Sequence, residues 1–284
     1  MRKLLTILFL ITSCANANAA TFSHLYVVGD SFSDTGHGVQ IGQLLSTSYY
    51  NQSEASNGPI WPEQLMAALG KPYNQGDNQA VSGAATYTYQ TTFGSQLVTR
   101  PGLIDQINSF QLLNANRSVF AIWTGHNDLS LSPPDSLNQA ADSALATVKN
   151  GVALLRKKGA TRILVLGLCD WAVTPAAHRT PDQQGVMNVA VLRFNTGLQQ
   201  FARQMTTKLA GRATVRYVDT YDFLDGVRSQ TANPDGIGTT DPQWICCRDW
   251  SAGNNYGYWD GVHYTTFIYD QLAQKLKAII NKMK

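Results

Sequence analysis

Residues 24–36 read HLYVVGDSFSDTG, and this stretch decides the fold of the chain. Its first part, residues 24–28, is a short apolar run that ends directly in Gly29, Asp30 and Ser31. Short apolar runs without alternating polar residues are typical of strands in a parallel sheet that is covered on both faces. Glycine lets the backbone turn tightly where such a strand ends. The stretch therefore predicts a buried strand followed by a polar turn at the edge of a sheet.

The same pattern recurs along the chain. Further apolar runs predict strands at residues 118–124, 161–168 and 214–218, with a shorter one near residues 79–81. The intervening stretches have helical spacing, shown by Phe194, Leu198, Phe201, Met205 and Leu209 and again by Leu272, Leu276, Ile279 and Met283. Alternating strands and helices predict an α/β fold, a three-layer α/β/α sandwich with a central parallel sheet. Reactive groups in such sheets gather at the carboxyl ends of the strands, so the first two polar turns share one edge.

The charge balance excludes two classes of protein. The chain has 22 Lys and Arg against 19 Asp and Glu, a net charge of +3, and the first 20 residues hold two of the basic residues. The remainder is nearly neutral and has no basic stripe or cluster. This argues against a nucleic-acid binder and against a protein held electrostatically at a membrane. No linker, repeat or charge block divides residues 21–284, so we expect a single domain with one sizeable core.

The N-terminus predicts export. Arg2 and Lys3 precede the apolar run of residues 4–11, and small residues follow up to residue 20. This order is typical of a secretory signal peptide, so we expect residues 1–20 to be removed and the protein to be secreted, through the periplasm. A second interpretation is a lipoprotein cleavage box at Cys14, which would leave the protein anchored by lipid. An ordinary buried helix is the third.

Cysteine usage follows from that compartment. Without Cys14 the chain keeps Cys169, Cys246 and Cys247. An odd number in an oxidising compartment predicts one disulfide and one leftover thiol, and we expect Cys169 to bond to Cys246 or Cys247. A strained bond between the two neighbours and three unpaired thiols are the alternatives. The cysteine spacing is not that of a zinc site, and we expect no metal and no cofactor.

Three residues form a candidate catalytic set. Ser31 follows the first strand at a place where a helix could begin, and an alkoxide there would be stabilised by free N–H groups. Residues 259–263 read WDGVH, so Asp260 precedes His263 by three positions and its carboxylate can reach the imidazole Nδ1. The other ring nitrogen is then free to accept a proton from the serine, which is the arrangement of a catalytic triad. Taken singly, each string could be a capping turn or a surface turn.

Two further strings supply donors for an oxyanion. Asn127 follows the second strand in the string GHND, residues 125–128, and Gly83 lies in the string NQAVSGA, residues 78–84. With the Ser31 N–H they make an oxyanion hole of three donors, Ser31, Gly83 and Asn127, and each such donor is typically worth about 3 kcal/mol of transition-state stabilisation. Alone, Asn127 could be a turn residue and Gly83 a strand-end bend.

These four strings, in this order, resemble the GDSL or SGNH hydrolase family over the whole stretch from Gly29 to His263. The resemblance implies a flavodoxin-like α/β/α sandwich and ester hydrolysis without a metal, with Ser31, Asp260 and His263 as catalytic residues. It also implies Gly83 and Asn127 as oxyanion donors. One departure is Tyr264, where many relatives have proline. The extended form GDSFSDTG, residues 29–36, is similar to a bacterial branch of secreted lysophospholipases, phospholipases A, thermolabile haemolysins and glycerophospholipid:cholesterol acyltransferases. Plant lipases of the family share it.

Three functions follow as hypotheses. The first is a secreted serine esterase that releases fatty acid from phospholipids or lysophospholipids, in transient contact with membranes or micelles, through an acyl-enzyme that water or an alcohol such as cholesterol resolves. The second is an esterase on acetylated glycans or on short-chain or aryl esters. The third is a binding protein that kept the fold without turnover. Because His263 must be neutral to accept a proton, we expect activity to climb from acid toward neutral pH and to need no divalent metal.

A long segment without helical spacing precedes the Asp260–His263 string. Residues 228–258 are rich in Gly, Asn, Asp and Thr, and a loop of this length is well above the usual connection. We expect a lid, an acyl-chain contact or a processing site there, with an inert surface loop as the alternative. We also expect Asp170 and Trp171 to line the site and His126 only to pack or hydrogen-bond locally.

Overall fold

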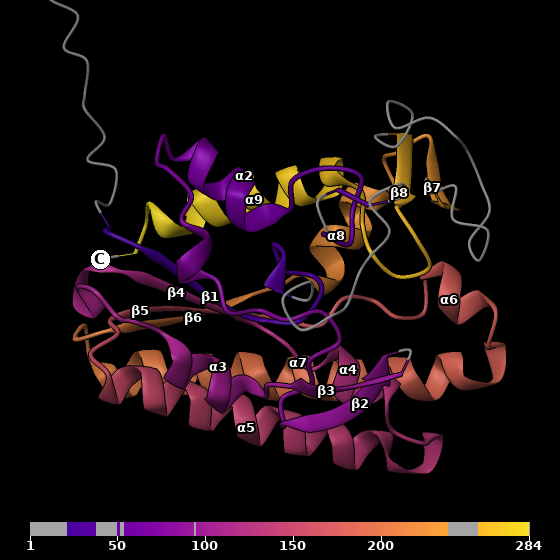
Figure 1. Cartoon of the computed structure of the whole chain (residues 1–284), viewed down its shortest axis with the longest axis horizontal. Helices are drawn as coiled ribbons and strands as arrows, with labels where there is room; N and C mark the ends of the chain where they lie inside the picture. The colour runs from indigo at the N-terminus through magenta and orange to yellow at the C-terminus, as the bar shows by residue number, and fades with distance from the viewer. Residues whose placement is uncertain (1–21, 38–49, 52–53, 94, 238–254, 284) are drawn as a thin grey trace, which may run out of the picture.

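The computed structural model describes residues 22–37, 50–51, 54–93, 95–237 and 255–283 (Figure 1). The predicted signal peptide at residues 1–20, with Cys14 in it, lies outside these ranges, as do Cys246 and Cys247. Within the ranges, no helix combines the length and the apolar character that crossing a bilayer requires.

The central sheet is parallel and has the strand order β1-β4-β5-β6. Its strands are β1 (Leu25–Gly29), β4 (Val119–Trp123), β5 (Arg162–Leu166) and β6 (Thr214–Val218), each within a predicted strand or one residue beyond it. The short piece expected near residues 79–81 lies beside β1, where the Gln79 and Val81 N–H groups donate to the carbonyls of Val27 and Gly29 at 2.8 and 3.1 Å. It forms a bridge there rather than a full strand.

Helices cover both faces of the sheet, and the predicted three-layer α/β/α sandwich is confirmed (Figure 1). One face carries α3 (Leu103–Ser109), α5 (Leu137–Lys157) and α7 (Pro181–Leu209). The opposite face carries α2 (Trp61–Ala68), α8 (Tyr221–Arg228) and α9 (Thr266–Ile280). The short helices are α4 (His126–Ser130), α6 (Pro175–His178), η1 (Gln75–Asp77), η2 (Ala115–Arg117) and η3 (Pro134–Ser136).

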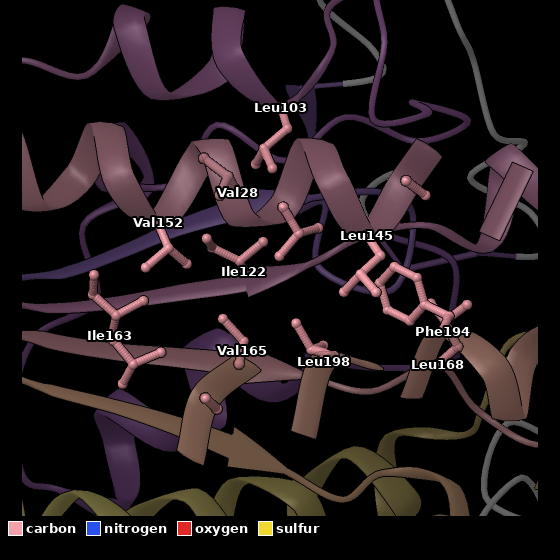
Figure 2. Packing of buried hydrophobic residues seen from close by; sticks show 14 of the residues in the cluster. Val28, Leu103, Ile122, Leu145, Val152, Ile163, Val165, Leu168, Phe194 and Leu198 are labelled. Carbon is pink, nitrogen blue, oxygen red and sulfur yellow. The ribbon is translucent and has the colours of Figure 1, made fainter. Parts of the chain in front are cut away.

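The strands are apolar on both sides because each side has its own core. In β1, Tyr26 and Val28 face the cluster with α5 and α7, whereas Leu25 and Val27 face the cluster with α2 and α9. Figure 2 shows the first cluster, in which strand residues pack against helix residues; those labelled are Val28, Leu103, Ile122, Leu145, Val152, Ile163, Val165, Leu168, Phe194 and Leu198. Burial on two faces explains why the strands read as continuous apolar runs.

Two small sheets lie outside the central one. β2 (Tyr89–Phe93) and β3 (Gln96–Arg100) form an antiparallel hairpin, and β7 (Asn233–Ile237) pairs in parallel with β8 (Tyr256–Tyr258). The second sheet departs from the long structureless loop expected at residues 228–258, because both ends of that segment pair with each other. The lid hypothesis covers residues 228–258 and stays a prediction, because residues 238–254 of that segment lie outside the described part of the chain.

Candidate active site

The loop after β1 presents Ser31 on a tight turn. The Ser33 N–H donates to the Asp30 carbonyl at 3.0 Å, and the Phe32 N–H donates to Asp30 Oδ1 at 3.1 Å. Ser31 therefore lies in this turn, and no helix begins at it, contrary to the expectation from sequence. Gly29 is required because a Cβ there would lie 2.1 Å from the Trp123 carbonyl oxygen of neighbouring β4. The close approach of the two backbones fixes where the turn begins.

The structure brings Ser31, His263 and Asp260 together. The Ser31 hydroxyl donates to His263 Nε2 at 2.7 Å, across 232 positions of sequence. The His263 Nδ1–H donates to Asp260 Oδ2, also at 2.7 Å. This is the nucleophile, base and orienting carboxylate arrangement that the spacing predicted.

The three-residue spacing of Asp260 and His263 has a local cause. Asp260 Oδ1 accepts the backbone N–H groups of Val262 and His263, each at 2.8 Å. The same carboxylate thus holds the turn and the imidazole. The Gly261 carbonyl accepts the Ala176 N–H at 2.9 Å, which fixes the turn on α6.

Burial and charge act in opposite directions on this pair. Burial by itself lowers the pKa of His263, but the Asp260 carboxylate and the charge of Asp30 outweigh it, so the pKa is raised above its ordinary 6.5. Burial raises the pKa of Asp260, yet the imidazole and the hydrogen bonds from His263 and Val262 leave it below its ordinary 3.8. Asp260 is therefore a carboxylate at neutral pH. Tyr50, which sequence reasoning did not single out, donates its hydroxyl to Asp260 Oδ2 at 3.2 Å.

The other two expected oxyanion donors, Gly83 and Asn127, line the same cavity as Ser31. Gly83 has φ +79°, a conformation that favours glycine, and no described residue accepts its N–H. Asn127 lies in the first turn of α4, and its Nδ2 donates to the Ala84 carbonyl at 2.9 Å. That bond uses one N–H of the amide and leaves the second for a ligand. The loop that carries Gly83 and the first turn of α4 are therefore neighbours joined by this hydrogen bond.

These groups line one cavity of about 290 Å³. Its polar residues include Ser31, Gly83, Asn127 and His263, while the apolar walls come from Phe32, Ala55, Trp171 and Val262. Trp171 thus lies where expected. Asp170 is not a lining residue, and its carboxylate accepts the Ala172 N–H at 2.8 Å.

His126 makes hydrogen bonds, as expected, and also lines the site. It lines the cavity, and its Nε2 accepts the Cys169 N–H at 3.3 Å. Two other residues lay outside every motif: Arg100 donates to the Ser82 carbonyl and Tyr89 to the Gly83 carbonyl. No sequence signal marks Tyr50, Tyr89 or Arg100. The partners of Tyr50 and Arg100 lie 210 and 18 positions away, and the contact from Tyr89 to the Gly83 carbonyl follows no local pattern.

Among the described residues Cys169 forms no disulfide, and the bond expected to Cys246 or Cys247 involves residues outside that part of the chain. Cys169 is a buried free thiol, and burial raises its pKa well above the ordinary value. It packs in the apolar cluster beneath the sheet edge, next to Tyr264. Cys246 and Cys247 lie outside the described residues.

The chain is similar to known proteins in sequence and in fold. The family model for GDSL-like Lipase/Acylhydrolase matches residues 25–276. The chain is 24% identical over 248 residues to the phosphatidylcholine-sterol acyltransferase of Aeromonas hydrophila, covering 86% of this chain and 70% of the relative. It is 26% identical over 236 residues to an acetylesterase of Thermothelomyces thermophilus, covering 77% and 76%. The solved lipase Lip_vut3 from a goat rumen metagenome is similar in fold, with a TM-score of 0.50 and 13% identity over 90% of this chain and 96% of that one.

Proposed function

Because this chain belongs to the GDSL-like lipase/acylhydrolase family and is a serine ester hydrolase, we propose that Ser31, His263 and Asp260 catalyse the release of fatty acid from phospholipids or lysophospholipids. The observation that carries the proposal is the unbroken hydrogen-bond chain from Asp260 through His263 to Ser31, with both bonds at 2.7 Å. The chain ends in a cavity that has apolar walls, as a site for an acyl ester needs.

The first half of the reaction forms an acyl-enzyme. Ser31 Oγ attacks the ester carbonyl carbon while its proton passes to His263 Nε2. The resulting tetrahedral oxyanion accepts hydrogen bonds from the Ser31 and Gly83 N–H groups and from the second N–H of Asn127 Nδ2. When the intermediate collapses, the C–O bond to the alcohol breaks and His263 returns the proton to that leaving oxygen.

The second half removes the acyl group. His263 takes a proton from water as the water oxygen attacks the acyl-enzyme carbonyl. When this second tetrahedral intermediate collapses, the bond from the carbonyl carbon to Ser31 Oγ breaks, His263 returns the proton to Oγ, and the fatty acid leaves. An alcohol can take the place of water, and the product is then a new ester. A sterol acceptor is proposed here because a relative, matched over 70% of its own length, is named phosphatidylcholine-sterol acyltransferase.

A lipid substrate is supported by the cavity walls and by this relative. Phe32, Ala55, Trp171 and Val262 offer an apolar surface beside the nucleophile. The cavity of about 290 Å³ holds the ester and the first part of an acyl chain, so the rest of a long chain must extend past its mouth. Such a substrate would be drawn from a membrane or micelle in transient contact with the protein.

A second substrate class, acetyl and other short-chain esters, is favoured by the cavity volume. About 290 Å³ lies at the lower end of the range of roughly 300–1,000 Å³ for small-molecule pockets. A short acyl group fits such a space entirely. The relative named acetylesterase supports the same choice.

A chain-length series separates these classes. Purified protein is incubated with lysophosphatidylcholines, phosphatidylcholine with cholesterol, p-nitrophenyl acetate and acetylxylan, and released fatty acid, sterol ester and acetate are measured together. We expect kcat/KM to rise with acyl length on the lysolipids and to vanish in Ser31→Ala. A preference for acetyl esters would select the second class. Equal turnover by Ser31→Ala and the parent would overturn the proposal by showing that Ser31 is not the nucleophile. No turnover by the parent would overturn it as well and leave a binding protein.

We also propose that the protein is exported with removal of residues 1–20. The support is the order of charged, apolar and small residues in that segment. The mass and N-terminal sequence of protein from a culture medium test it. A start near residue 21 is expected, whereas a lipid-modified Cys14 would select the anchored form.

A further inference from the structure

The peptide between Ser82 and Gly83 contains the oxyanion donor contributed by Gly83. Its N–H is that of Gly83, and its carbonyl is that of Ser82. Arg100 Nη1 donates to this carbonyl at 2.6 Å in a buried hydrogen bond. One peptide group therefore joins the guanidinium to the place where the oxyanion forms.

The guanidinium is enclosed by the loop that it holds. Arg100 is 4% exposed, and its Cζ and Nε lie 3.5 Å from the position that a Cβ of Gly83 would take. Burial lowers the pKa of Arg100, while the charge of the Asp34 carboxylate acts to raise it. Arginine keeps its proton in proteins, so a full positive charge stands behind the peptide.

The opposite side of the same residue is also held by a charged group. The Ser82 N–H donates to Asp34 Oδ2 at 2.6 Å, and Asp34 Oδ1 accepts the Gly36 and His37 N–H groups at 2.8 and 2.7 Å. The Asp34 carboxylate and the Arg100 guanidinium thus hold the two backbone polar groups of Ser82, its N–H and its carbonyl. The Gly83 N–H cannot rotate away without breaking one of these bonds.

The hairpin supplies a second contact. Tyr89 and Arg100 are directly opposite each other in the β2–β3 pairing, and the Tyr89 hydroxyl donates to the Gly83 carbonyl at 2.6 Å. Residues opposite each other share a face of the hairpin. The hairpin therefore presents two adjacent side chains to the carbonyls of Ser82 and Gly83 in the oxyanion loop, residues 78–84. It thus supports the loop that carries the Gly83 donor.

We propose that Arg100 is a positioning residue that holds the Ser82–Gly83 peptide and polarises it, so that the Gly83 N–H is a stronger donor to the oxyanion. This inference rests on the proposed ester hydrolysis at Ser31. A cation bound to the carbonyl draws electron density from the amide, and linked hydrogen bonds strengthen one another in a buried site. The gain falls on the transition state, because the negative charge at the donor exists only there.

Three variants test the proposal: Arg100→Met, Arg100→Lys and Tyr89→Phe. Kinetics on p-nitrophenyl acetate are measured per active site titrated with a phosphonate, so that misfolded molecules are not counted. We expect Arg100→Met to lower kcat about ten- to a hundredfold with KM within about threefold, since removal of one oxyanion donor outright costs about 10²–10³. The Ki of a boronic acid, which forms an anionic tetrahedral adduct, should rise by the same factor. Arg100→Lys should recover part of the loss, because lysine keeps the charge with a different donor geometry.

Two controls separate this effect from a loss of stability or of any guanidinium. Arg193→Met removes an exposed arginine paired with Asp142, and Val152→Ala truncates a fully buried core residue. Both should keep kcat per titrated site, although Val152→Ala lowers the melting temperature. Tyr89→Phe should show a smaller loss than Arg100→Met.

An Arg100→Met enzyme with kcat within twofold of the parent, or with KM raised and the boronate Ki unchanged, would overturn the inference while leaving the proposed function intact. If Val152→Ala lost as much kcat as Arg100→Met, the effect would be structural and the inference would also fail. Absence of ester hydrolysis in the parent would instead refute the proposed function itself.

Discussion

His126 Nδ1 lies 3.0 Å from Asp30 Oδ2, and this contact ties the loop that carries Ser31 to the helix that carries Asn127. Because His126 Nε2 accepts the Cys169 N–H, the ring proton is on Nδ1 and is donated to Asp30. The Phe32 ring also packs on the imidazole, with 4.4 Å between centroids. One histidine therefore joins the carboxyl ends of β1, β4 and β5, where the site is built.

We expect His126→Ala to lower kcat/KM about ten- to a hundredfold by loosening the Asn127 donor. It should also cost about 1–3 kcal/mol of unfolding free energy, because the buried Asp30 loses a partner. The matched control is His24→Ala, which removes a similar pair with Asp77 at the amino end of β1. Ester kinetics and urea unfolding measure both effects, and an equal loss of activity in the two variants would contradict the prediction.

The pH profile follows from the direction of the His263 shift. The imidazole must be neutral to accept the Ser31 proton, and its pKa is raised above the ordinary 6.5, chiefly because the Asp260 carboxylate outweighs the effect of burial. Protonated His263 thus persists to higher pH than in a free imidazole. We expect the acid limb of kcat/KM to have its midpoint above pH 6.5, measured on p-nitrophenyl acetate from pH 5 to 9. A midpoint below 6.5 would show that burial dominates.

Asp260→Asn should lower kcat by about 10³–10⁴-fold. The amide N–H₂ would face Nδ1 and donate to it, which moves the ring proton to Nε2 and blocks acceptance of the Ser31 proton. Asp142→Asn, which removes an exposed carboxylate paired with Arg193, should leave kcat unchanged. Stopped assays of the two variants at pH 8 make the comparison, and similar rates for both would refute the orienting role.

Gly83→Ala and Gly70→Ala are a matched pair for the oxyanion loop. Both glycines have positive φ, +79° and +66°, so alanine strains either backbone by about 1–2 kcal/mol. Only at Gly83 does the new methyl meet a group of the site, the Arg100 guanidinium at 3.5 Å. We expect similar losses of melting temperature but a loss of kcat/KM only in Gly83→Ala. Retention of full activity there would contradict the prediction that a side chain at this position displaces the Gly83 N–H from the oxyanion.

Leu164 tests the two-sided core. It lies in β5, is fully buried and packs in the cluster with α2 and α9. Leu164→Ala should cost about 2–5 kcal/mol of unfolding free energy. The exposed Leu113, with 60% of its surface accessible, provides the control, and Leu113→Ala should cost less than about 1 kcal/mol. Chemical denaturation of both variants checks the difference.

The strands of the central sheet could be predicted because two-sided burial makes each a continuous apolar run. The β2–β3 hairpin could not: residues 89–100 are largely polar and carry no strong alternation. Arg100 of this hairpin donates to the Ser82 carbonyl, 18 positions away, and no local pattern marks such a contact.

The sequence by itself determined the strands of the central sheet with their intervening helices, the turn after β1, and the Asp260–His263 unit. Each of these depends on neighbours within a few residues. Only the tertiary structure decided that Ser31 meets His263 and that the Gly83 loop is hydrogen-bonded to the start of α4. It also decided that Arg100 donates to the Ser82 carbonyl of that loop. Parallel strands bring their carboxyl ends to one edge whatever their separation along the chain, so these contacts follow from the packing of the sheet and its helices rather than from any local pattern.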